Sequence, residues 1–255
     1  MNPDAKGDEL LERFDADGFV VVRRFVVGEE LRELVAQVDR FVRDVVPQMP
    51  PEQVFFEAKH DRATLKQIQR MGDHDPRFDD LIMAGRFREV AERLLRGLVV
   101  PKNLQYFDKP PGVGRPTPPH QDGYYFMLDP CEAVTVWLAL DAADEETGCV
   151  RYVRGSHQRG IREHGRTTTL GFSQGIVDYP TELDRQCEAA VPAAPGDLLV
   201  HDARTIHLAD GNRSAERSRR ALGFIYYSER AREDAAAHAA YQRKLADEMK
   251  VAGKI

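Results

Sequence analysis

Apolar residues in the first part of the chain recur at the three- and four-residue intervals of a helix face. The clearest stretches are 29–47 and 77–96, and a shorter one spans 8–14. Such spacing places apolar side chains on one side of a helix, and a proline such as Pro47 ends it. After the first helix, the run Phe-Val-Val-Val at 19–22 follows a glycine turn. It is expected to form a buried strand.

After Gly97 the apolar pattern changes to that of β-strands. Short runs of β-branched and aromatic residues are separated by clusters of Gly, Pro, Asn and Asp, which favour turns. These runs are 98–107, 134–140, 149–153, 198–201 and 221–228. Short strands at this spacing favour an antiparallel barrel or jelly roll with the early helices packed on its outside.

One large domain accounts for the whole chain. A mainly β protein of 255 residues need not divide into two domains. We predict a single domain over 1–255, with flanking α-helices in an N-terminal part over about 1–97. The jelly-roll core covers about 98–228, and a C-terminal helix covers about 229–250, where the sequence is charged and rich in alanine.

Charge and cysteine content indicate the kind of partner. The chain has 36 basic and 42 acidic residues, a net charge of −6. This charge supplies no general field for nucleic acid or an anionic membrane, so we expect a small-molecule substrate. The three cysteines form no disulfide framework, and the charged N-terminus lacks a secretion signal. A soluble cytoplasmic protein is expected, and its oligomeric state is left open.

The tripeptide His120-Gln121-Asp122 is the strongest chemical signal in the chain. In an extended strand, alternate side chains point to the same side, so His120 and Asp122 face one way and Gln121 the other. One imidazole and one carboxylate are thus available as metal ligands. A second imidazole would complete the facial triad of two histidines and one carboxylate that is typical of non-haem Fe(II) oxygenases.

Two histidines compete for the third position. His201 and His207 flank the segment 202–206, which follows a Pro-Gly-Asp turn and an apolar strand. His207 lies near a strand end, and His201 is a plausible alternative. His157 and His164 are expected in loops. The residues alone leave the choice between His201 and His207 open.

Arg219 is a candidate for binding an anion. In a strand running from it to Tyr227, Arg219 would share one face with Ala221 and Gly223. Two very small residues beside an arginine suggest a pocket with room for a ligand. A guanidinium there could bind a carboxylate through two parallel hydrogen bonds.

In this order, these residues resemble the phytanoyl-CoA dioxygenase family of Fe(II)- and 2-oxoglutarate-dependent oxygenases. The similarity covers most of the chain. It is carried by 17–22, Lys109-Pro110-Pro111, His120-Gln121-Asp122, Trp137, 148–150, Gly155-Ser156-His157, Pro195-Gly196-Asp197, His207, Asn212 and Arg219. The resemblance implies a double-stranded β-helix, a cupin-like jelly roll.

The resemblance also assigns roles to residues. It implies that His120, Asp122 and His207 bind Fe(II), which selects His207 over His201. Arg219 is expected to anchor 2-oxoglutarate, although the spacing from His207 leaves Arg213 and Arg217 as rivals. Residues expected to line the co-substrate pocket are Trp137, Gln105 and Gln67, with Lys66 as a rival to Gln67.

The implied activity is the hydroxylation of a small organic molecule with O2, releasing succinate and CO2. Asp122 favours hydroxylation, because related halogenases have a small residue in place of this carboxylate. The alternatives are a metal-dependent jelly-roll isomerase or lyase and a non-catalytic module that binds metal or 2-oxoglutarate. The mixture of aromatic and acidic side chains near the metal pair and in the early irregular segment would suit a partly polar molecule of modest size, including a cation. These candidates for the substrate wall are Tyr124, Tyr125, Phe126, Phe55, Phe56 and Glu57.

Overall fold

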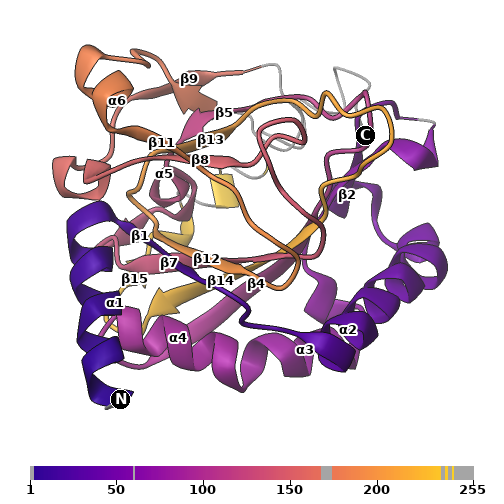
Figure 1. The fold of residues 1–255 in the computed structure, drawn as a ribbon, viewed down its shortest axis with the longest axis horizontal. Coiled ribbons are helices and arrows are strands. Elements are labelled where there is room, and N and C mark those ends of the chain that lie inside the picture. Colours follow the sequence, from indigo (N-terminus) through magenta and orange to yellow (C-terminus); the bar gives the residue numbers. More distant parts are fainter. Residues whose placement is uncertain (1–2, 60, 168–173, 237–238, 241–242, 244–255) are drawn as a thin grey trace.

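Two antiparallel sheets face each other across the middle of the protein in the computed structural model (Figure 1). The structure describes residues 3–59, 61–167, 174–236, 239–240 and 243. The larger sheet has seven strands in the order β1-β12-β7-β14-β4-β3-β2, and the smaller has four in the order β11-β8-β13-β5. This arrangement is the jelly roll that the strand pattern predicts.

Five of the seven strands of the larger sheet have bounds close to the predicted runs, and β2 and β3 were not predicted. Its strands are β1 (Phe19–Val22), β12 (Leu198–Asp202), β7 (Ala133–Ala139), β14 (Ala221–Ser228), β4 (Val99–Phe107), β3 (Leu65–Ile68) and β2 (Val54–Phe56). The smaller sheet contains β11 (Glu188–Val191), β8 (Val150–Val153), β13 (His207–Ala209) and β5 (Thr117–His120). Two further pairs are β9 (His164–Arg166) with β10 (Gln174–Ile176), and β6 (Leu128–Asp129) with β15 (Arg232–Glu233).

Helices cover the outer face of the larger sheet, opposite the smaller one (Figure 1). They are α1 (Pro3–Asp17), α2 (Gly28–Arg40), α3 (Pro76–Met83) and α4 (Arg86–Leu94), and α5 (Asp122–Phe126) and α6 (Glu182–Cys187) lie elsewhere. Phe87 of α4 stacks on Phe224 of β14 with ring centroids 4.3 Å apart. The apolar helix faces that the sequence predicts thus pack on alternate residues of the sheet to form the main core.

Short 3₁₀ and π turns connect these elements. They are η1 (Phe41–Val45), η2 (Val46–Gln48), η3 (Pro51–Gln53), η4 (Arg62–Thr64), η5 (Met71–Asp73) and η6 (Ser156–Arg159). The predicted helix over 29–47 therefore ends as a π turn and a 3₁₀ turn that contains Pro47. The predicted helix over 77–96 is two helices, because Gly85 between them has a left-handed φ of 81°.

The N-terminal part is less helical than predicted. β1, β2 and β3 all lie within 1–97 and belong to the larger sheet. The strand over 19–22 is confirmed, but β2 and β3 have only three and four residues, too few to show a strand period. In the predicted C-terminal helix, 232–233 instead pair with β6. Residues 237–238, 241–242 and 244–250 of that prediction lie outside the described residues.

Alternation along the strands decides which side chains face the smaller sheet. Val136 and Leu138 belong to the helix-covered core, whereas Trp137 belongs to a second cluster between the sheets. His201 of β12 is the cross-strand neighbour of Thr135 of β7. The inner face of the larger sheet is therefore where polar side chains interrupt the apolar packing.

Candidate metal centre

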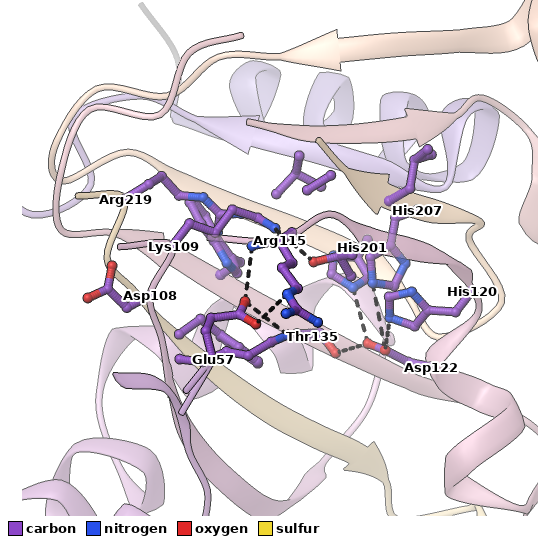
Figure 2. A pocket seen from close by; sticks show the side chains of 17 residues that line it. Glu57, Asp108, Lys109, Arg115, His120, Asp122, Thr135, His201, His207 and Arg219 are labelled. Atoms are coloured by element: carbon purple, nitrogen blue, oxygen red, sulfur yellow. Dashed lines mark hydrogen bonds and ion pairs between the residues drawn. The ribbon is translucent and has the colours of Figure 1, made fainter. Parts of the chain in front are cut away.

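A cavity of about 680 Å³, open to solvent, lies between the two sheets. Figure 2 shows Asp122 and the three histidines together at one end of the cavity and Arg219 at the other end. The lining residues are Glu57, Lys66, Phe107, Asp108, Lys109, Arg115, Thr117, His120, Asp122, Thr135, Trp137, Val150, His201, His207, Leu208, Ala209 and Arg219.

His120, Asp122 and His207 converge at one end of the cavity. His120 ends β5, and His207, which begins β13, is its cross-strand neighbour. Their Nε2 atoms lie 3.5 and 3.7 Å from Asp122 Oδ1, and one ligand atom from each of the three residues lies within 4.8 Å of the others. Asp122 is the first residue of α5, but Gln121 before it is extended, so the predicted alternation still places His120 and Asp122 together.

Backbone carbonyls set the tautomers of the two imidazoles. His120 donates Nδ1–H to the Pro118 carbonyl at 2.8 Å, and His207 donates Nδ1–H to the Thr205 carbonyl at 3.0 Å. With Nδ1 of each ring bonded to a carbonyl, Nε2 is the nitrogen that faces Asp122. Burial, together with the neighbouring His120 and His201 imidazoles, holds the pKa of His207 well below its ordinary value. This lowered pKa favours the neutral form of His207, the form in which imidazole binds a metal.

Asp122 carries the negative charge of this end of the cavity. Burial alone would raise the pKa of its carboxyl, but His207, His120 and His201 outweigh burial and hold that pKa well below its ordinary value. Its Oδ2 atom accepts hydrogen bonds from the Thr135 hydroxyl at 2.5 Å and from His201 Nε2–H at 3.2 Å. The carboxylate is thus ionised and held from two sides.

His201, the rival to His207, also lies in the cavity. Its ring centroid is 4.3 Å from that of His207. Its Nε2, however, contacts Asp122 Oδ2, and its Nδ1 accepts from the Tyr152 hydroxyl at 3.0 Å. Both ring nitrogens of His201 are therefore occupied by hydrogen bonds within the protein.

Arg219 lies in the cavity, and its two rivals lie elsewhere. Its side chain is 4% exposed, and its guanidinium carbon lies 5.4 Å from the Trp137 ring. Its Nε atom has no hydrogen-bond partner among the described residues. Arg217 pairs instead with Asp144 and Glu146, and Arg213 donates to the Glu145 carbonyl. A buried guanidinium with an unused donor favours an anionic ligand.

The surroundings of Arg219 differ from the sequence prediction. Arg219 precedes β14, which begins at Ala221. The space above Gly223 is filled, because a Cβ there would lie 2.7 Å from the Phe107 ring. Small residues in a strand therefore made room for a neighbouring aromatic ring and not for a ligand.

Of the predicted co-substrate residues, Trp137 lines the cavity, and Gln105 and Gln67 do not. Gln67 donates its side-chain amide to Gln105 Oε1 at 2.8 Å, and both side chains are buried. Gln105 shares the inner sheet face with Trp137 across Gly223. Lys66, the rival to Gln67, does line the cavity and pairs with Glu57 at 3.2 Å.

Further charged residues line the cavity that sequence reasoning had not connected. Lys109 is buried and donates to the Arg115 carbonyl and the Thr117 hydroxyl. Burial, with repulsion from Arg219 and Lys66, lowers the pKa of Lys109 well below its ordinary value. Arg115 is exposed and lies near Glu57. The Lys-Pro-Pro run was part of the family signature, but nothing in it shows that the lysine turns inward.

Most of the predicted substrate wall packs elsewhere. Of the six candidates only Glu57 lines the cavity. Tyr125 donates its hydroxyl to the Gln174 carbonyl, Tyr124 stacks on His164, and Phe126 packs against Tyr227. The two tyrosines thus hold β9 and β10 beside α5, whereas Phe126 packs against β14.

Gln121, between the two ligand candidates, connects three segments behind them. Its side-chain amide donates to the carbonyls of Gly160 and Arg204, and its Oε1 accepts from the Arg162 backbone N–H. Its own backbone N–H donates to His164 Nε2 at 3.1 Å. His164, expected in a loop, lies in β9 and is buried.

Comparison with known proteins identifies the family of the chain. The family model of phytanoyl-CoA dioxygenase (PhyH) matches residues 14–221. The chain belongs to the phytanoyl-CoA dioxygenase family. It is therefore an enzyme of the Fe(II)- and 2-oxoglutarate-dependent oxygenase class, as the resemblance implied.

Alignments with relatives named for this family cover most of this chain and most of each relative. The phytanoyl-CoA dioxygenase domain-containing protein 1 homolog of Caenorhabditis elegans is 25% identical over 258 residues, covering 84% of this chain and 88% of that protein. Phytanoyl-CoA dioxygenase 1 of Oryza sativa subsp. japonica is 28% identical over 239 residues, covering 81% and 84%.

Solved structures show the same fold. EvdO2 of Micromonospora carbonacea var. aurantiaca, crystallised with 2-oxoglutarate, is 27% identical, with a TM-score of 0.71 over 89% of this chain and 92% of that one. The epimerase SnoN, crystallised with Fe³⁺ and alpha ketoglutarate, is 23% identical, with a TM-score of 0.71 over 90% and 86%.

In the part of the chain that the structure describes, no helix has the length and apolar character of a membrane span.

Proposed function

We propose that this enzyme hydroxylates a small organic molecule with Fe(II), 2-oxoglutarate and O2. The observation that supports it is one cavity with a cluster of two imidazoles and a carboxylate at one end and a buried guanidinium at the other. Proteins of the same fold are crystallised with Fe³⁺ or 2-oxoglutarate. We assign both groups to this cavity.

The donor set at one end fits Fe(II). Two imidazoles present Nε2, and one ionised carboxylate presents Oδ1, to a common point. His120, Asp122 and His207 would hold the metal and leave positions open, as in the facial triad. With 2-oxoglutarate bound beside it, the iron would supply the oxidation of a substrate C–H bond by O2, with release of succinate and CO2.

The other end fits a dicarboxylate. Arg219 would pair with the carboxylate of 2-oxoglutarate farther from the metal, because its buried guanidinium has an unused donor. Trp137 would pack beside the co-substrate, since it lines the cavity under the same guanidinium. Gln105 and Gln67 would support that wall through their hydrogen bond to each other, from outside the cavity.

Asp122 supports hydroxylation over halogenation. Its carboxylate fills the position that a small residue leaves to a halide in related halogenases. Thr135 and His201 both bond to this carboxylate, so it is a fixed part of the cavity.

We also propose a cytoplasmic location and a single domain. All three cysteines are free, which suits a reducing compartment. Strands from the two ends of the chain, β1 and β14, lie in one sheet, which supports treating 1–255 as one domain. The partner we propose is a small-molecule substrate.

Uncoupled turnover tests this function before any substrate is known. Purified protein with Fe(II), 2-oxoglutarate and air should form succinate, and omitting any one of them should stop it. Anaerobic addition of 2-oxoglutarate to the Fe(II) protein should produce a visible charge-transfer band. Asp122→Ala should lose both signals, and the exposed control Arg217→Ala should keep them.

Two outcomes would contradict the proposal. Fe(II) binding without a band or succinate would favour a metal-dependent isomerase or lyase. Binding of 2-oxoglutarate without any turnover would favour a non-catalytic module. A metabolite screen with succinate as readout, followed by analysis of the oxidised product, would then identify the substrate.

A further inference from the structure

Both carboxylate oxygens of Asp122 have defined partners, and those of Oδ2 are not the candidate metal ligands. Oδ1 faces Nε2 of His120 and of His207, both from the smaller sheet. Oδ2 faces Thr135 and His201, cross-strand neighbours in the larger sheet. The carboxylate thus contacts a ligand pair from one sheet and a donor pair from the other, and Figure 2 shows its contacts with all four side chains.

Both donors on Oδ2 are fixed in direction. Thr135 is β-branched and 7% exposed on a central strand, so its hydroxyl has little freedom. His201 is 3% exposed, and its Nδ1 accepts from the Tyr152 hydroxyl at 3.0 Å. Because a carboxylate oxygen can only accept, Nε2 of His201 is the donor to Oδ2, and the Tyr152 hydroxyl can donate to Nδ1.

Tyr152 is itself held by both sheets. It lies on β8, where it is the cross-strand neighbour of His207. Its ring stacks on Phe19 of β1 with centroids 4.4 Å apart. The chain of contacts from Phe19 through Tyr152 and His201 to Asp122 therefore joins the two sheets behind the ligand cluster.

We propose that His201 is a positioning residue that, oriented by Tyr152 and aided by Thr135, makes Asp122 a one-oxygen ligand. The inference rests on the proposed function. A carboxylate can bind a metal through one oxygen or through both, and the second mode takes up another coordination position. With Oδ2 engaged by two donors, only Oδ1 would be available to a bound metal, which would leave room for 2-oxoglutarate and O2.

The same contacts argue against His201 as a fourth ligand. Its Nε2 would have to give up the proton that bonds to Asp122. The proton would then lie on Nδ1, and the Tyr152 hydroxyl would have to accept it instead of donating. Asp122 Oδ2 would then keep a single protein donor, Thr135, in a buried site where an unmatched charged oxygen is costly. His201 therefore acts through Asp122.

Anaerobic calorimetric titration with Fe(II) tests the proposal. His201→Phe keeps the ring shape and removes the donor, and Thr135→Val removes the second donor. Each should weaken Fe(II) binding about tenfold to a hundredfold, the usual effect of losing such an outer hydrogen bond. Tyr152→Phe should weaken it less, because His201 keeps its Nε2–H. His201→Gln, whose amide can donate from a similar place, should recover most of the affinity.

A spectroscopic readout separates positioning from general damage. At saturating Fe(II) and 2-oxoglutarate without O2, His201→Phe should shift the visible band, and His201→Gln should return it toward the wild-type position. His157→Phe is the matched control, since His157 is equally buried but bonds to the Asp15 carbonyl. It should leave both affinity and band within experimental error.

Four outcomes decide the matter. Wild-type protein that does not bind Fe(II) would overturn the proposed function and with it this inference. Wild-type affinity in both His201→Phe and Thr135→Val would overturn the inference alone. Complete loss of binding in both His201→Phe and His201→Gln would make His201 a ligand and overturn the positioning role. If His201→Phe does not fold, weakened binding in Thr135→Val and Tyr152→Phe supports the proposal, and wild-type affinity in both overturns it.

Discussion

Each histidine around the cavity has one ring nitrogen bonded to a fixed oxygen, and this bond decides what the other nitrogen can do. His120 and His207 bond through Nδ1 to backbone carbonyls and present a lone pair. His201 accepts from Tyr152 through Nδ1 and presents a proton. Three imidazoles within one cavity therefore have two different roles, and the difference lies in their partners.

Co-substrate binding should need the guanidinium of Arg219 and not only its positive charge. Arg219→Lys keeps the charge but cannot form two parallel hydrogen bonds, and a shorter buried ammonium cannot reach as far. We expect 2-oxoglutarate affinity to fall by about 2 kcal/mol, roughly thirtyfold in Kd. Binding to the anaerobic Fe(II) protein, followed by its visible band, measures this. Arg217→Lys serves as control, and an equal loss there would show that surface charge is responsible.

His164 should make stability fall in mild acid. Its pKa is lowered, mainly by burial, and its Nε2 accepts a hydrogen bond from the Gln121 backbone N–H. A histidine with a lowered folded pKa binds its proton more readily in the unfolded chain. Its contribution to stability is therefore fully present above the ordinary pKa of 6.5 and is lost as pH falls below it.

Urea unfolding at a series of pH values measures this effect. Between pH 7 and 5, wild type should lose more free energy of unfolding than His164→Gln, by at most about 1.4 kcal/mol per pH unit. Other histidines contribute to both proteins and cancel in the difference. Parallel curves would show that His164 does not titrate in this range.

How much of the site the sequence reveals depends on whether a contact is local. His120 and Asp122 are two residues apart, so strand alternation alone pairs them. Thr135 and His201 meet Asp122 only through the pairing of β7 with β12, which no local pattern encodes. Lys66 reaches the cavity at an irregular step in the pairing of β2 with β3. That irregularity is why the choice between Lys66 and Gln67 could not be made from the sequence.

At the scale of elements, local pattern predicted the long strands and missed the short ones. β4 and β14 were predicted within one residue, because eight or nine residues with apolar alternation leave little choice. β2 and β3 escaped detection in a Pro-rich stretch. The extended stretch of His120-Gln121-Asp122 ends at once in α5, so the same three residues both finish a strand and start a helix.

Gln121 should matter for stability more than for chemistry, because it ties three elements together. Gln121→Leu is similar in size but leaves the Gly160 and Arg204 carbonyls and the Arg162 N–H without their bonds. We expect a loss of about 3 kcal/mol in the free energy of unfolding. Gln186→Leu on exposed α6 is the matched control and should change it by less than about 0.5 kcal/mol. Chemical denaturation compares them, and similar losses would contradict a bracing role.

At the scale of the whole molecule, bound metal should slow unfolding and leave refolding unchanged. The ligands come together only when β5 and β13 pair, so the unfolded chain offers no such site. Fe(II) at a hundred times its Kd should stabilise the protein by about 2.7 kcal/mol, nearly a hundredfold in the unfolding rate. Stopped-flow unfolding with and without a chelator measures it. Faster refolding with Fe(II) would mean that the site forms early.

The pairing of β1 with β12 also sets an order of events during synthesis. The Thr205 hydroxyl donates to the Gly18 carbonyl across 187 residues, and Phe19 completes the wall behind His201. The first strand to leave the ribosome must therefore wait for nearly the last one. Contacts so distant along the chain make folding slow, in the range of milliseconds to seconds or longer. Until then β1 is an unpaired apolar edge, and a nascent chain stalled before β12 is the form of this protein that a chaperone would have to protect.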